Sequence, residues 1–330
     1  GRARGGPPAG RRAALAAWAG FTLPSAVLLT AFAFGLDLIG GPAGDGAVHG
    51  LKLVAVAIVA QAVWGMARRL APDRPRAGIA TAALILVTLV GGSPGQLGAI
   101  AGGAAAGLWW CRGDPTPAGG SLRVPLSRRT GLVALSAFLA LLLLGPALAR
   151  ATGAQAPALF DAFYRAGALV FGGGHVVLPL LQAEVVAPGW VDDTVFLAGY
   201  GAAQAAPGPL FTFAAYLGAV MKPAPNGVAG AALALFAVFL PGLLLVLGTL
   251  PFWDRLRTRP RAQAAMRGAN AAVVGVLGAA LYDPLWTSAV RDPDDFAMAV
   301  AGFVLLTAWR APPWVVVVLG AGIGAVRGLA

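Results

Sequence analysis

Two stretches of this sequence interrupt apolar segments with residues that end helices and free backbone N–H groups. The first is FGGGH at 171–175 and the second is PGPLFT at 207–212. Consecutive glycines can turn their amides toward one point, with no side chain to keep a ligand away. Pro209 suits the first turn of a new helix, which leaves the next three amides unpaired at its positive end. We therefore predict anion binding by Gly172, Gly173, Gly174, Pro207, Gly208, Pro209, Leu210, Phe211 and Thr212, although a close helix crossing or a kink explains each break alone equally well.

The few polar side chains near these breaks are further candidates, because ionisable groups in long apolar segments are costly and usually functional. Arg165, six residues before Phe171, is placed to neutralise a dianion or to pair with Asp161 one helical turn earlier. Glu184 is the only glutamate of the chain, and it is a candidate proton carrier or counter-charge unless it lies at the membrane interface. Gln204 precedes the second break and is predicted to donate to an oxyanion or to cap exposed carbonyls.

Three other residues are weaker candidates. His175 could titrate near physiological pH, but a hydrogen-bonded packing role is the more common one for a lone histidine. Lys52 lies one turn after His49, and Asn270 and Arg267 occupy the corresponding positions of an internal repeat. This symmetric placement suggests a cavity lining, against the stronger alternative that Lys52 snorkels to the interface.

The composition places these residues in a membrane protein. Of the 330 residues, 58% are hydrophobic and 11% are charged, with a mean hydropathy of +0.77. Most of the apolar runs are long enough, or nearly so, to cross ~30 Å of hydrocarbon as helices. They lie at 13–36, 47–67, 77–91, 96–111, 131–149, 195–221, 226–250, 263–282, 295–309 and 313–327. The expected fold is an all-α, polytopic membrane helical bundle with interrupted helices.

The net charge of +11 comes mostly from arginines clustered between the apolar runs, so topology explains it better than nucleic-acid binding. By the positive-inside rule, the N-terminal region and loops 68–76, 112–129 and 255–261 are cytoplasmic. Loops 37–46 and 283–295 are acidic and are expected to be external. The predicted location is the bacterial cytoplasmic membrane.

An internal repeat relates the two ends of the chain at a separation of 217–218 residues. TLP at 22–24 matches FLP at 239–241, Gly50 matches Gly268, and Gly102 matches Gly320. Equivalent loops carry opposite charge, which predicts an inverted-topology repeat, the plan of many secondary transporters. We divide the chain into a first repeat at 1–130, a linker at 131–156 and a second repeat at 157–330, with 157–187 crossing once. The first copies of both helix breaks would precede residue 1, so we expect a fragment of a longer transporter.

The stretch FGGGHVVLPLLQAEVVAPGWVDDTVFLAGYGAAQAAPGPLFTFAAYLGAV at 171–220 closely resembles the chromate ion transporter family. The family carries a Phe-Gly-Gly-Gly motif, a Pro-Leu-Leu helix with an acidic residue, a Gly-Trp and a Gln-x-x-Pro-Gly-Pro break. GFTLPSA at 20–26 is similar to the end of the family's first half, whereas His175 stands where the family more typically has an aromatic residue. The resemblance implies a two-half exporter of chromate, with sulfate as the natural look-alike.

The expected partners are a chromate-like or sulfate-like oxyanion and the lipid bilayer, with a homodimer left open and no nucleic acid. One cysteine and two histidines make a metal site improbable, and no cofactor is expected. The alternatives are a passive anion channel and, from a different class, a membrane enzyme acting on a lipid substrate. The enzyme would normally need an acidic cluster for a metal or a nucleophile with a base, and the predicted spans contain neither.

Overall fold

The structure is a computed structural model that describes residues 9–36, 41–112, 127–170, 177–253 and 259–329. The glycine stretch, with Gly172, Gly173, Gly174 and His175, lies outside the described residues. Within the described ranges the chain is helical and has no strand. The predicted all-α fold is confirmed.

The helices follow the predicted apolar runs closely. The longer ones are α1 (Ala9–Leu36), α2 (Pro42–Leu70), α3 (Arg74–Val90), α4 (Gly92–Trp110), α5 (Arg128–Thr152), α10 (Gly227–Thr249), α12 (Pro260–Ala280), α14 (Pro293–Thr307) and α15 (Pro313–Leu329). Shorter ones are α6 (Gln155–Ala168), α7 (Val177–Val185), α8 (Asp193–Ala205), α9 (Phe213–Val220) and α13 (Thr287–Ala289). Among the described residues, five helical segments are long and apolar enough to cross a membrane, which makes this a polytopic membrane bundle.

Two pairs of helices cross at glycines in the same way. Helix α2 runs antiparallel to α15, with Gly50 on the backbone of Gly320 and Gly324. Helix α12 runs antiparallel to α4, with Gly268 on the backbone of Gly103 and Gly107. Gly50 and Gly268 are the predicted repeat partners, but the partner of Gly320 is Gly103 and not Gly102, beside which nothing lies within 4 Å.

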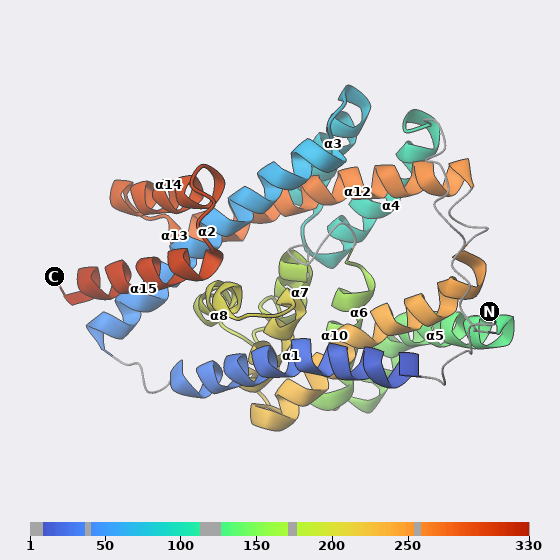
Figure 1. Ribbon diagram of the computed structural model, residues 1–330, viewed down its shortest axis with the longest axis horizontal. Coiled ribbons are helices and arrows are strands. Elements are labelled where there is room, and N and C mark those ends of the chain that lie inside the picture. Colours follow the sequence, from blue (N-terminus) through green and yellow to red (C-terminus); the bar gives the residue numbers. More distant parts are fainter. Residues whose placement is uncertain (1–8, 37–40, 113–126, 171–176, 254–258, 330) are drawn as a thin grey trace, which may run out of the picture.

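Helices α1 and α10, which are equivalent in the predicted repeat, run in opposite directions. Gly227, at the start of α10, faces Phe34 near the end of α1. Further along, the rings of Trp18 and Phe239 lie 5.6 Å apart, so α1 and α10 are antiparallel (Figure 1). An inverted repeat predicts this relation between equivalent helices.

Helices α8 and α9 form a re-entrant hairpin, so the prediction that 195–221 crosses the membrane is wrong. The backbone N–H of Lys222 donates to the carbonyl of Trp190 at 3.0 Å, which places both ends of the segment at one face. The two helices have 13 and 8 residues, and each is shorter than the ~30 Å needed to cross. Gly208 in the turn between them lies against Phe21 and Ser25, halfway along α1.

Segment 155–190 turns back in the same manner, so the prediction that 157–187 crosses once is also wrong. Helix α5 begins beside the end of α10, where Gly131 contacts Gly248. Because α5 crosses the bundle, α6 starts at the face where α10 begins, which is also the face of Trp190. Gly167, near the end of α6, packs on Val238 and Pro241 halfway along α10. The second predicted break therefore belongs to a hairpin that enters from the face at which α6 begins, whereas the first break lies outside the described residues.

Candidate functional site

Arg165 lies between two carboxylates from the two arms of the α6–α7 hairpin. Its Nη2 donates to Glu184 Oε2 at 2.5 Å, and its Nε lies 3.1 Å from Asp161 Oδ2 on the same helix. The structure thus brings together the three charged residues that the sequence singled out in this segment. The predicted Asp161–Arg165 pair is present, and Glu184 is a second partner that sequence spacing did not predict.

The second break is held by hydroxyl groups. Thr212 Oγ1 donates to the carbonyl of Pro209 at 2.8 Å, and Ser25 Oγ of α1 lies 2.8 Å from Thr212 Oγ1. Because the hydroxyl proton of Thr212 is already donated to the carbonyl of Pro209, Ser25 is the donor in its hydrogen bond with Thr212. Ser25 and Thr212 are both buried, so α1 is tied to the break by a bond that lies away from solvent.

One predicted anion donor in this break is already paired. The backbone N–H of Thr212 donates to the carbonyl of Pro209 at 2.9 Å, because residues 210–212 form a single tight turn before α9. The prediction that all three amides after Pro209 are unpaired is therefore wrong for Thr212. Nearby, Gln204 Nε2 is buried and lacks a hydrogen-bond partner among the described residues. That amide is a donor available to a ligand in this region.

Lys52 lies at the entrance of the α8–α9 hairpin. Its side chain is 3% exposed and donates to Thr194 Oγ1 at 2.8 Å, so the snorkelling alternative is wrong. Next to Thr194, Asp193 Oδ1 accepts from Gln182 Nε2 of α7 at 2.8 Å. These hydrogen bonds fix the N-terminal end of α8 to α2 and α7. Asn270, the repeat partner of Lys52, is half-buried on α12.

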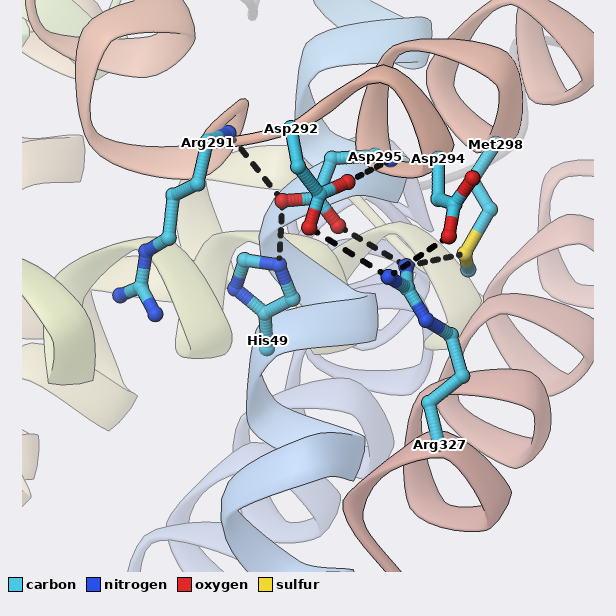
Figure 2. Close-up of polar contacts among 7 residues, drawn as sticks. All are labelled: His49, Arg291, Asp292, Asp294, Asp295, Met298 and Arg327. Atoms are coloured by element: carbon cyan, nitrogen blue, oxygen red, sulfur yellow. Dashed lines mark hydrogen bonds and ion pairs between the residues drawn. The ribbon is translucent and has the colours of Figure 1, made fainter. Parts of the chain in front are cut away.

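A polar cluster at the start of α14 was not predicted (Figure 2). Asp295 is 1% exposed and accepts from His49 Nε2 at 2.9 Å and from Arg327 Nη1 at 3.0 Å. It joins α2, α14 and α15 beside a cavity of about 430 Å³. The feature of the sequence that could have indicated this cluster is the N-cap of α14, where Asp292 Oδ1 accepts from the backbone N–H of Asp295 at 2.8 Å.

Together these features place ionisable and hydrogen-bonding groups inside an apolar bundle, around α6, α7 and the α8–α9 hairpin. The described residues contain no group of histidine, cysteine and acidic side chains able to hold a metal ion. The available chemistry is charge pairing, hydrogen bonding and proton transfer. An inverted bundle with re-entrant helices near its midplane is the architecture of a secondary membrane transporter.

Comparison with known proteins agrees with this class. The family model "Chromate transporter" matches residues 5–108 and 157–325. The chain therefore belongs to the chromate transporter family. No solved structure matches it.

Several curated relatives are similar to parts of the chain. A chromate transport protein of Pseudomonas aeruginosa is 34% identical over 172 residues, which cover 50% of this chain and 40% of that protein. A chromate transport protein of Cupriavidus metallidurans strain CH34 is 31% identical over 120 residues, covering 36% of this chain and 29% of the relative. An uncharacterized transporter of Bacillus subtilis strain 168, YwrB, is 38% identical over 125 residues, covering 37% and 61%. The chain thus spans less than half the length of the two chromate transport proteins.

Proposed function

We propose that this protein carries chromate outward across the bacterial cytoplasmic membrane and so confers chromate resistance, with sulfate as a competing ligand. Membership of the chromate transporter family supports the substrate class. Relatives named chromate transport protein support chromate itself. The repeat boundaries at 130 and 156, and a homodimeric assembly, stay predictions.

The observation that carries the proposal is the position of Arg165. It lies in the last turn of α6, 29% exposed, with its guanidinium between two acidic side chains. A guanidinium presents a planar fork of donors that matches the oxygens of a tetrahedral oxyanion. In this proposal the anion displaces part of that pairing and binds the exposed side of Arg165.

Backbone and amide donors complete the proposed site. Gly172, Gly173 and Gly174 come four to six residues after the end of α6 in the sequence, and they are proposed to bind the anion through their N–H groups. The second hairpin would contribute Gln204 and the turn formed by Pro207, Gly208, Pro209, Leu210 and Phe211. Thr212 is proposed only to hold this turn, because its amide and hydroxyl are both bonded to Pro209.

The charge of the anion supports the proposed outward direction. Moving a dianion out of a cell with an inside-negative potential is favourable by about 4.6 kcal/mol per 100 mV, because each charge contributes about 2.3 kcal/mol. The arginine-rich loops 68–76 and 255–261 are proposed to face the cytoplasm and to concentrate anions there. Neither movement down the membrane potential nor attraction of anions by basic loops requires ATP hydrolysis.

The test is chromate uptake into inside-out vesicles from cells that express the open reading frame containing this chain. Wild-type protein should accumulate labelled chromate under an interior-positive potential, and excess sulfate should compete. Arg165→Gln should abolish uptake, whereas Arg129→Gln, a substitution at the exposed start of α5, should not. Uptake by Arg165→Gln at the wild-type rate would disprove the assignment.

A passive anion channel is the second candidate, and the same preparation distinguishes it. Proteoliposomes with a chromate gradient give a reversal potential. A channel reports the gradient of the anion alone, whereas a coupled carrier also responds to the pH gradient. A reversal potential that ignores pH would favour the channel.

A further inference from the structure

The two carboxylates beside Arg165 are bonded to it unequally. Glu184 accepts a hydrogen bond from Nη2 at 2.5 Å. Asp161 Oδ2 is 3.1 Å from Nε, but this Nε makes no hydrogen bond, so the contact is electrostatic only. Asp161 is therefore the more weakly held partner of the arginine.

The other oxygen of Asp161 has no partner. Asp161 Oδ1 is buried and accepts no hydrogen bond from any described residue. It faces Gly145 on α5, where an added methyl group would lie 2.5 Å away. The Asp161 side chain is 6% exposed, against 12% for Glu184. A carboxylate in this position lacks both solvent and the hydrogen bonds that would compensate for burial.

The charge around Asp161 does not balance if both carboxylates are ionised. Arg165 faces it from α6 and Glu184 lies opposite on α7, which gives this trio a net charge of −1. On α5 the neighbouring residue is Gly145, and the more distant Arg150 acts on Asp161 only through its field. From α10, the side that packs on α6 is apolar and includes Phe236 and Pro241. An excess charge in a buried cluster is destabilising, and one bound proton removes it.

We propose that Asp161 binds a proton that travels together with the oxyanion, while Glu184 acts as the permanent counter-charge of Arg165. This inference rests on the proposed oxyanion transport. With Asp161 ionised, an anion approaching Arg165 meets two carboxylates, and with Asp161 protonated it meets one. Proton binding and anion binding therefore strengthen each other by the same factor. A dianion and one proton together carry one negative charge outward, which an inside-negative membrane potential still favours.

The first experiment measures chromate binding to the chain in nanodiscs as a function of pH. In wild-type protein the affinity should rise as pH falls, approaching about tenfold per pH unit above the pH at which Asp161 titrates, as expected for one linked proton. Asp161→Asn should bind with a constant affinity close to the low-pH value. Glu184→Gln, the matched control, should keep a pH dependence. Asp161→Asn with the wild-type slope would overturn the proposal.

The second experiment needs no chromate. Infrared spectra of the wild-type protein should show the carbonyl band of a buried protonated carboxyl group, which Asp161→Asn removes and Glu184→Gln retains. If wild-type protein shows this band but never binds chromate, the proposed function fails and the proton site stands. If Asp161→Asn does not fold, Gly145→Ala replaces it, because the added methyl group crowds Oδ1 and should shift the band. A wild-type protein without the band at any pH would overturn the proposal.

Discussion

Replacing Gly268 by alanine should destabilise the bundle, although alanine is the better helix former. A methyl group on Gly268 would lie 2.6 Å from the Cα of Gly107, which is 0.8 Å inside the 3.4 Å at which ordinary contact begins. The Cα belongs to the backbone of α4, and the methyl group is fixed in position by the backbone of α12, so neither can rotate away and the two helices must separate. Overpacking of this kind costs about 1–3 kcal/mol. The gain in helix propensity offsets about 1 kcal/mol, which leaves a net loss of up to roughly 2 kcal/mol.

The repeat gives this experiment two internal controls. Gly50→Ala, at the equivalent crossing of α2 and α15, would place its methyl group 2.8 Å from the carbonyl carbon of Gly320 and should lose a similar amount. Gly102→Ala meets no atom within 4 Å and should be neutral or slightly stabilising. Thermal unfolding in detergent, followed by size-exclusion chromatography, ranks the three variants. Equal stability of Gly268→Ala and Gly102→Ala would refute the steric argument, and a neutral Gly50→Ala would refute the equivalence of the crossings.

Three further substitutions test the polar contacts. Ser25→Ala should cost about 1 kcal/mol in thermal unfolding, because it removes the hydrogen bond to Thr212 that ties α1 to the break; an unchanged midpoint would show that the bond is dispensable. Asp295→Ala should cost about 1.5–3 kcal/mol in thermal unfolding, since His49 and Arg327, both partly exposed, lose hydrogen bonds to a charged partner; an unchanged midpoint would contradict this. Asp73→Ala should cost about 1 kcal/mol by removing the N-cap of α3. Hydrogen bonds from Arg76 lower the pKa of Asp73, so this contribution should be present above the ordinary carboxyl pKa and lost as pH falls through the lowered value; unfolding midpoints of the two proteins that stay parallel across this acid range would count against it.

The sequence predicted the helices well, because hydrophobic length is a strong signal. The run at 226–250, for example, became α10 at Gly227–Thr249. The repeat register was predicted to within one residue: Gly50 and Gly268 are equivalent, whereas Gly102 should have been Gly103. Sequence matches count identities along the chain, but close packing depends on which side of α4 a glycine lies. A shift of one residue rotates that side by about 100°, which only the folded bundle can reveal.

The candidate site was predicted only where its partners are close in sequence. Arg165 and Asp161 are four residues apart, and helical periodicity is enough to pair them. Glu184 reaches the same arginine from another helix, and Asp295 meets His49 across 246 positions. Such contacts depend on how helices are placed in the bundle, about which spacing carries no information. The isolated glutamate and the aspartate in the first turn of α14 were the available signals.

The re-entrant hairpin of α8 and α9 was missed for a physical reason. Helices α8 and α9 together have about the length of one membrane span, so hydropathy cannot distinguish a crossing from a turn at mid-depth. A crossing segment and a re-entrant segment differ in whether their two ends lie at opposite faces or at one face. Lys222 returning to Trp190 closes the hairpin at one face, while Ser25 of α1 holds its tip at mid-depth. A turn placed there must have its backbone groups satisfied by protein or by a wet cavity. At the tip of the α8–α9 hairpin this requirement is met by protein, because Thr212 and Ser25 supply buried hydroxyl groups beside the turn.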